Sequence, residues 1–157
     1  MAYKEIKPLA EKGDPGAQYN LGMMYFNAQG VPQDDFEAVK WFRKAAEQGF
    51  AQAQNCLGRM YGDGKGVVQD YVEAVKWYRK AAEQGYGDAQ HLLGVWYAMG
   101  KGVQQDFVQA YMWFNLAAMQ GDSEAQNDRD KVAKMMTPSQ INLAQQLASE
   151  WKPKGKD

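Results

Sequence analysis

The chain has 157 residues, with 18 Lys and Arg against 19 Asp and Glu and a formal net charge of −1 at pH 7. Because the charges nearly cancel, the chain lacks the broad positive field with which proteins attract nucleic acid. No stretch approaches the roughly 18 consecutive apolar residues of a membrane span, and the first ten residues lack the apolar centre of a signal peptide. The chain as written therefore suits the cytoplasm, or the periplasm or exterior if a signal peptide has been removed.

The residues that most enzymes use for nucleophilic or metal chemistry are scarce. There is one His, one Cys, one Thr and three Ser. A single cysteine, Cys56, excludes an intramolecular disulfide. We expect no metal and no cofactor. The glycine-rich run YGDGKGVV at 61–68 is no phosphate loop, since no Ser or Thr follows its Lys and the run follows a helix pattern.

Residues 1–13 are predicted to form an N-terminal capping half-repeat. Residues 3–12 resemble a shortened copy of a later helix, with Ile6 and Ala10 at the positions of Phe42 and Ala46. Pro8 is expected to limit the length of this helix, because proline removes a helical hydrogen bond and clashes with the preceding turn.

One phrase then recurs at a fixed period. KWFRKAAEQGF at 40–50 returns as KWYRKAAEQGY at 76–86 and, more loosely, as MWFNLAAMQGD at 112–122, so successive copies begin 36 residues apart. A period of this length is typical of helical repeat arrays. It divides the chain into repeat 1 at 14–49, repeat 2 at 50–85 and repeat 3 at 86–121.

The first half of each repeat reads as a helix. Ala17, Leu21 and Tyr25 recur every four residues and share one helical face, and Asp14 with Pro15 is a suitable start. A glycine stands inside each of these helices, where it costs about 1 kcal/mol relative to alanine. We expect close approach of the second helix, through its small alanines, at Gly22, Gly58 and Gly94.

The second half also reads as a helix. Ala38, Trp41 and Ala45 form a single apolar stripe, and the tryptophans at this position are predicted to fill the core. Each helix has a capping signal at its start and a glycine at its end. The starts are Asp34, Asp70 and Asp106, and the ends are Gly49, Gly85 and Gly121.

The pattern changes after Gly121. Residues 122–151 are predicted to form a partial repeat followed by a C-terminal capping helix, which opens with a capping box at Thr137 and Gln140. Terminal repeats of a solenoid need altered outer faces to stay soluble. Residues 152–157 are predicted to be a disordered tail.

The run A-Q-x-x-L-G-x-x-Y, then G-V-x-x-D, then A-x-x-W-[FY]-x-x-A-A-x-x-G resembles the Sel1-like repeat, a relative of the tetratricopeptide repeat, over residues 13–121. The resemblance implies an all-α fold, an α/α solenoid or right-handed superhelix of about three helix-turn-helix repeats with capping helices. It also implies an adaptor or scaffold for protein complexes, often bacterial. A cysteine-rich branch of the family staples each repeat with a disulfide, and this chain, with Cys56 alone, departs from it.

In such repeats the first helices line a concave groove. The groove-facing positions of the related tetratricopeptide repeat can be transferred to this chain. The residues at these positions differ from row to row, whereas the framework residues do not. The predicted protein-binding residues are Tyr19, Met23, Phe26, Asn27, Asn55, Arg59, Asp63, His91, Val95, Met99, Asn127 and Lys131.

The leading hypothesis is a non-enzymatic interaction module that binds a peptide or protein segment in this groove. We expect a monomer, or an end-to-end dimer that forms through the exposed repeat ends. One alternative is an exported bacterial factor that contacts a host or cell-wall ligand. A second is an enzyme or enzyme subunit that uses His91 as its base.

Overall fold

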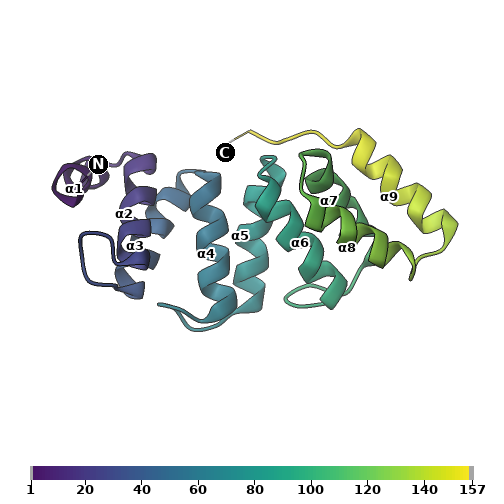
Figure 1. Cartoon of the computed structure of the whole chain (residues 1–157), viewed down its shortest axis with the longest axis horizontal. Helices are drawn as coiled ribbons and strands as arrows, with labels where there is room; N and C mark the ends of the chain where they lie inside the picture. Colours follow the sequence, from purple (N-terminus) through teal and green to yellow (C-terminus); the bar gives the residue numbers. More distant parts are fainter. Residues whose placement is uncertain (1, 156–157) are drawn as a thin grey trace.

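The computed structural model describes residues 2–155, and every regular element in that range is a helix (Figure 1). Consecutive helices pack on one another, and the last packs against α7, so the helices form an elongated row. The prediction of an all-α solenoid is confirmed. The helices are α1 Tyr3–Glu11, α2 Pro15–Asn27, α3 Asp35–Glu47, α4 Ala51–Asp63, α5 Tyr71–Glu83, α6 Gly87–Met99, α7 Phe107–Met119, α8 Ser123–Ala133 and α9 Pro138–Glu150.

The helix boundaries follow the capping signals. The Asp34 side chain accepts a hydrogen bond from the Glu37 backbone N–H at 3.1 Å, and Asp70 and Asp106 cap α5 and α7 in the same way. The glycines that end α3, α5 and α7 have φ of +89°, +95° and +100°, values that a residue with a Cβ rarely adopts. None of the described helices is long and apolar enough to span a membrane.

The two ends of the chain differ from the prediction. Helix α1 continues through Pro8 to Glu11, so the proline does not end it, although at 9 residues α1 is shorter than the 13-residue helices of the repeats. Residues 152–155, which we expected to be disordered, extend from α9 along the array, and the Lys154 N–H donates to the Glu83 carbonyl oxygen at 2.7 Å. The rest of the predicted tail, residues 156 and 157, lies outside the described residues, as does residue 1.

The glycines inside α2, α4 and α6 do mark close helix approach. An ideal Cβ on Gly22 would lie 2.7 Å from the ring of Phe42 and 3.3 Å from the Ala38 carbonyl oxygen. The facing groups are therefore an aromatic ring and the alanine backbone, and small alanines alone do not account for the glycine. Tyr78 and Phe114 cover Gly58 and Gly94 in the same manner.

The repeated tryptophans fill the core, as predicted. Trp41, Trp77 and Trp113 are only 4–5% exposed, but no described residue accepts a hydrogen bond from their indole N–H groups. A buried unpaired donor costs about 1–3 kcal/mol. Burial of about 200 Å² of indole contributes about 5 kcal/mol at 25 cal/mol per Å², so packing outweighs the lost hydrogen bond.

A glutamine ladder that we did not predict joins the two helices of each repeat and connects the first of them to the helix before it. Gln84 donates through Nε2 to Oε1 of Gln54 at 2.8 Å, and Gln54 donates to the Ala46 carbonyl oxygen at 3.1 Å. Equivalent bonds join Gln48 to Gln18 and Gln120 to Gln90. Gln90 is fully buried, so the ladder satisfies polar groups that water cannot reach.

A second contact between repeats needs a glycine. Gly66, with φ +71°, lies so close to the start of α3 that a Cβ would overlap the Asp35 carbonyl oxygen. Gly102 meets the Tyr71 carbonyl oxygen one repeat later in the same way. The loop of each repeat therefore rests directly on the backbone of the previous repeat.

We predict that Gly66→Ala lowers the free energy of unfolding by about 2–5 kcal/mol, the sum of left-handed strain and steric overlap. Gly100→Ala is the matched control, because its φ of +69° is nearly the same and its nearest contact is the Gln105 Cβ at 3.2 Å. Ala28 already occupies the equivalent position in repeat 1 with φ +55°, so this control should lose only about 1 kcal/mol. Urea unfolding measures both values, and equal losses would contradict the overlap.

We also predict that Gln90→Met costs about 1–3 kcal/mol, because it removes two hydrogen bonds, to the Ala82 carbonyl and from the Gln120 amide, each worth about 0.5–1.5 kcal/mol. Gln126 occupies the same position in the last unit but is exposed. Gln126→Met should therefore change stability by less than about 0.5 kcal/mol. Thermal unfolding of the two variants tests the ladder, and similar melting temperatures would count against it.

Candidate functional site

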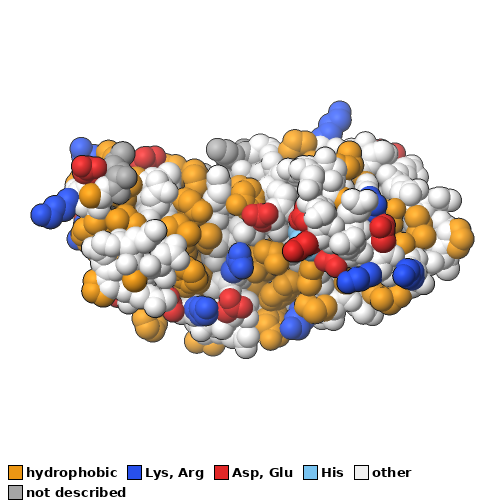
Figure 2. Space-filling view, viewed as in Figure 1, with side chains coloured by type: hydrophobic (Ala, Val, Ile, Leu, Met, Phe, Trp, Pro, Cys, Tyr) orange, Lys and Arg blue, Asp and Glu red, His pale blue; other side chains and the backbone are white. Residues whose placement is uncertain are grey.

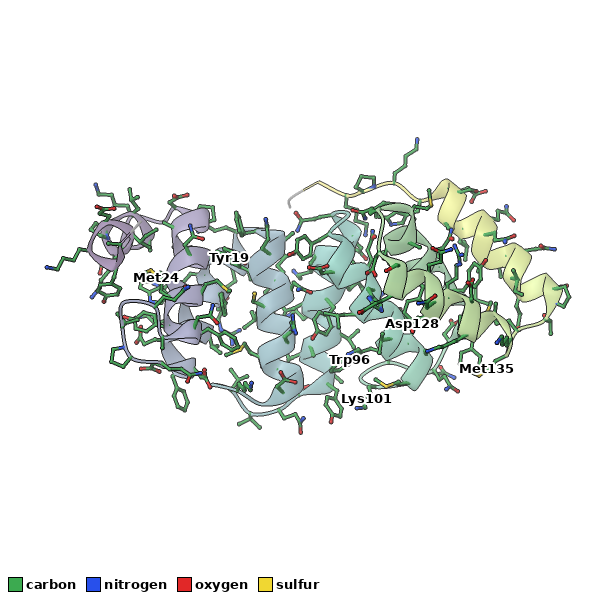
Figure 3. All side chains as sticks on the ribbon, viewed as in Figure 1. Tyr19, Met24, Trp96, Lys101, Asp128 and Met135 are labelled. Carbon is green, nitrogen blue, oxygen red and sulfur yellow. The ribbon has the colours of Figure 1, made fainter. Side chains whose placement is uncertain are left out.

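The predicted binding residues gather on one side of the array, formed by α2, α4, α6 and α8 and called here the groove face. Figure 2 shows apolar side chains over this face with acidic and basic side chains among them. In Figure 3 the labelled Tyr19 on α2, Trp96 on α6 and Asp128 on α8 mark the face from one end to the other. Two apolar cavities open on it.

The first cavity lies between α2 and α4 and has a volume of about 230 Å³. Its walls are apolar, and charged groups stand at its rim, where Lys65 Nζ lies 5.8 Å from the centre of the Phe26 ring. It brings together four predicted residues, Met23, Phe26, Arg59 and Asp63. The other lining residues are Phe42, Cys56, Met60 and Lys65.

The second cavity lies between α6 and α8 and has a volume of about 290 Å³. It brings together three predicted residues, Val95, Met99 and Lys131. Phe114, the ring that covers Gly94, contributes to its wall. The other lining residues are Ala98, Gln105, Phe107, Asp128, Val132 and Met135.

The space between α4 and α6 is filled by Trp96. An ideal Cβ on Gly62 would lie 3.0 Å from the Trp96 ring, which also meets Tyr71 and Tyr78 edge-on at 5.3 and 5.5 Å between ring centres. The other repeats have Met24 or Met60 at the position of Trp96. One large side chain over a glycine thus separates the two cavities.

His91 is held on both sides and does not present a free ring nitrogen. Its Nδ1 lies 3.0 Å from Asp122 Oδ2 and its Nε2 lies 2.7 Å from Asp128 Oδ2, and its ring meets Phe114 edge-on. A general base needs a nitrogen within reach of the substrate proton. The arrangement links α6 to the last unit and does not resemble a catalytic site.

The other predicted binding residues differ in how far their side chains are exposed. Asn55 is only 5% exposed and its Oδ1 has no described partner, so it belongs to the core and offers no surface to a ligand. Tyr19 is half-buried against Phe42 and Phe50, with ring centres 6.1 and 5.5 Å away. Asn27 and Asn127 are exposed but line neither cavity.

Sequence reasoning missed several residues of the cavity walls. Met60 and Val132 line the cavities and Trp96 separates them, and all three come from one repeated position whose residue type changes from row to row, so this variation could have identified them. Other missed residues are Lys65 and Gln105, which lie in the loop after the first helix of a repeat, and Phe107, which begins a second helix. The repeated motif does not mark these positions as binding residues. Among the described residues no group of His, Cys, Asp and Glu could hold a metal ion.

Comparison with known proteins identifies the repeats. A family model for the Sel1 repeat matches residues 15–50, 51–86 and 87–122, each one residue later than the rows drawn from the sequence. A search of curated proteins found no match.

Three solved bacterial structures are similar to the chain. A protective antigen of uropathogenic Escherichia coli with an SLR fold is 41% identical, with a TM-score of 0.87 over 93% of this chain and 31% of its own. A Sel1 repeat protein from Oxalobacter formigenes is 42% identical, with a TM-score of 0.73 over 75% and 49%. The Helicobacter pylori cysteine rich protein B is 25% identical, with a TM-score of 0.63 over 79% and 94%. The chain thus spans less than half of each of the first two.

The wall of the first cavity contains a weakly acidic thiol, and this gives a test of its geometry. Burial raises the pKa of Cys56 to about 11, although Arg59 and Tyr19 act in the opposite direction. At pH 8 the folded protein should therefore carry on the order of a hundred times less thiolate than an exposed cysteine. We predict that alkylation by iodoacetamide is slow and keeps accelerating above pH 9. The urea-unfolded chain is the control, and a plateau near pH 8.5 in the folded protein would contradict the burial.

Proposed function

This chain belongs to the Sel1 repeat family, and from that premise we propose that it is a non-enzymatic module that binds a segment of another protein along the groove face. The observation that carries the proposal is the pair of apolar cavities, separated by Trp96 and walled by residues that vary between otherwise matching repeats. The framework repeats, but the residues that line the two cavities differ. This favours a partner that presents a different side chain to each cavity.

The size of the cavities supports a protein partner. Small-molecule sites typically measure about 300–1,000 Å³, whereas these cavities measure about 230 and 290 Å³. Each suits one or two side chains of a longer segment. Buried apolar anchors of this kind supply most of the energy of protein interfaces.

The charged side chains at the rims of the cavities would orient the bound segment. Arg59, Asp63 and Lys65 surround the first cavity, and Asp128 and Lys131 stand at the second. Charged groups at a rim set orientation and partner choice more than they set affinity. We infer that the segment places one apolar side chain in each cavity and pairs its polar groups with these rims.

Site-specific photo-crosslinking tests the proposal. We expect p-benzoylphenylalanine at Phe26 and at Met99, one beside each cavity, to capture the same partner in the native cell. The matched control is Phe36, which is 77% exposed at the start of α3 but lines neither cavity. Capture at Phe36 alone, or of unrelated proteins at the two cavities, would refute a single segment bound along the face.

The captured partner then allows a quantitative check. Arg59→Glu with Phe26→Ala reverses one rim charge and removes one aromatic side chain of the cavity wall, and we expect the dissociation constant of the complex to rise at least about tenfold. Phe36→Ala should leave it unchanged. Circular dichroism confirms that each variant is folded before calorimetry is performed.

A further inference from the structure

The C-terminal segment is bound to the array like a peptide ligand. After α9 it runs back along the edge where α5 and α7 end (Figure 1). The Trp151 ring meets Trp113 edge-on, with centres 6.2 Å apart, and both Trp151 and Pro153 lie beside Gly85. Lys154 makes two contacts with Glu83, through its N–H to the carbonyl oxygen at 2.7 Å and through Nζ to Oε2 at 3.1 Å.

The chemistry of these contacts explains the conformation. The Glu83 carbonyl belongs to the last turn of α5, whose carbonyl groups have no partner within the helix. Pro153 holds the residue before it in an extended conformation, which leaves the Lys154 N–H free to donate. A positive side chain is also favourable at a helix C-terminus, where the helix dipole is negative.

Most residues around the segment recur, unchanged, one repeat earlier, and the exceptions are Met112 and Leu116 in the cluster against which Trp151 packs. Every position around Lys154 and Gly155, together with the glycine and tryptophan under the segment, has an identical residue 36 positions before it. The set Gln54, Lys76, Arg79, Lys80, Glu83, Gln84, Gly85 and Trp113 corresponds to Gln18, Lys40, Arg43, Lys44, Glu47, Gln48, Gly49 and Trp77.

The third repeat does not continue this series. Met112, Asn115, Leu116 and Met119 stand in α7 at the positions of Lys76, Arg79, Lys80 and Glu83. Met112 and Leu116 are buried, and α9 packs on this helix. Only α3 and α5 therefore end with the complete set, and the segment of this chain occupies the one at α5.

We propose that the end of α3, centred on Glu47 and Trp77, is a second docking site, which takes an extended segment of another protein. The segment would have an aromatic residue, a proline two positions later and a lysine directly after the proline, as in Trp151-Lys152-Pro153-Lys154. Glu47 and Gln48 are exposed there, Gly49 and Trp77 are buried, and no described residue donates to the Glu47 carbonyl. This site lies on a different edge from the groove face and does not depend on the function proposed for that face.

One difference sets the expected preference. Trp113 is flanked by Met112 and Leu116, whereas Trp77 has Lys76 Nζ and Lys80 Nζ each 5.3 Å from its ring centre. An incoming aromatic ring would meet these lysine stems and their ammonium groups, which are attracted to the face of an aromatic ring. Tryptophan should therefore bind better there than leucine.

The occupant is another protein and not a second copy of this chain. In a second copy Trp151 directly follows α9, whose buried Ala144 and Ala148 are held against α7. To reach a neighbouring molecule the segment would have to pull α9 away from its own core. A segment with no attached helix meets no such cost.

The test uses the full chain, labelled with 15N, and the synthetic peptide Ser-Glu-Trp-Lys-Pro-Lys-Gly, which copies residues 149–155. We expect saturable shifts of the Glu47, Gln48 and Gly49 amides and of the Trp77 indole. Replacement of tryptophan by leucine in the peptide should weaken binding. Glu47→Lys should weaken it about three- to fivefold, the range for an exposed ion pair, and a peptide with glutamate at the second lysine should recover affinity for that variant.

Three results would overturn the proposal. The first is a titration without shifts at residues 47–49. The second is a set of shifts confined to the groove face, for which Arg59→Glu is the control variant. The third is a dimer of the full chain, seen by sedimentation, that Lys154→Glu dissociates, since this would make a second copy the occupant.

Discussion

Each helix pair of this protein has an apolar face that only the next pair can cover, and the rest of the structure depends on how closely the pairs can approach. Two glycine contacts set that distance. Inside a repeat, the ring of Phe42 rests on Gly22; between repeats, Gly66 rests on the backbone at Asp35. The glutamine ladder then satisfies the polar groups that this approach buries. Because these contacts recur, the framework is almost the same in every repeat.

Most of this framework can be predicted from the sequence because the same pattern of residues occurs three times. A period of 36 residues, aspartates before each second helix and glycines after it specify nearly every boundary. The contacts between residues are harder to predict, because a repeated residue in the sequence does not show which residue it packs against. The glycines of the first helices indicated close approach, but the alignment could not show that an aromatic ring was the facing group. The glutamines also recur in the sequence, yet only the coordinates reveal that Gln84 donates to Gln54 on the other helix of the same repeat.

The candidate site could be predicted only in part, for a related reason. Residues such as Met23, Arg59 and Val95 lie where the transferred pattern placed them, but a fixed pattern assumes that each row behaves alike. Asn55 departs because it is buried in the core, and His91 departs because two aspartates from the next unit hold it. Neither departure can be read from the transferred positions themselves. The exported alternative remains a prediction from the sequence.

The contact between Lys154 and Glu83 also changes how the array should fold. Nearly all other bonds join neighbouring helices, and in such a chain stability is close to a sum of local and nearest-neighbour terms, so the ends can fray one unit at a time. The segment after α9 passes α7 and α6 and is anchored at α5. It therefore closes a loop around the last part of the molecule. Loss of the C-terminal helix then also removes the two Lys154 contacts from the end of the second repeat, so the last units are coupled beyond nearest neighbours. The first repeat and α1 keep the independence of an ordinary linear array.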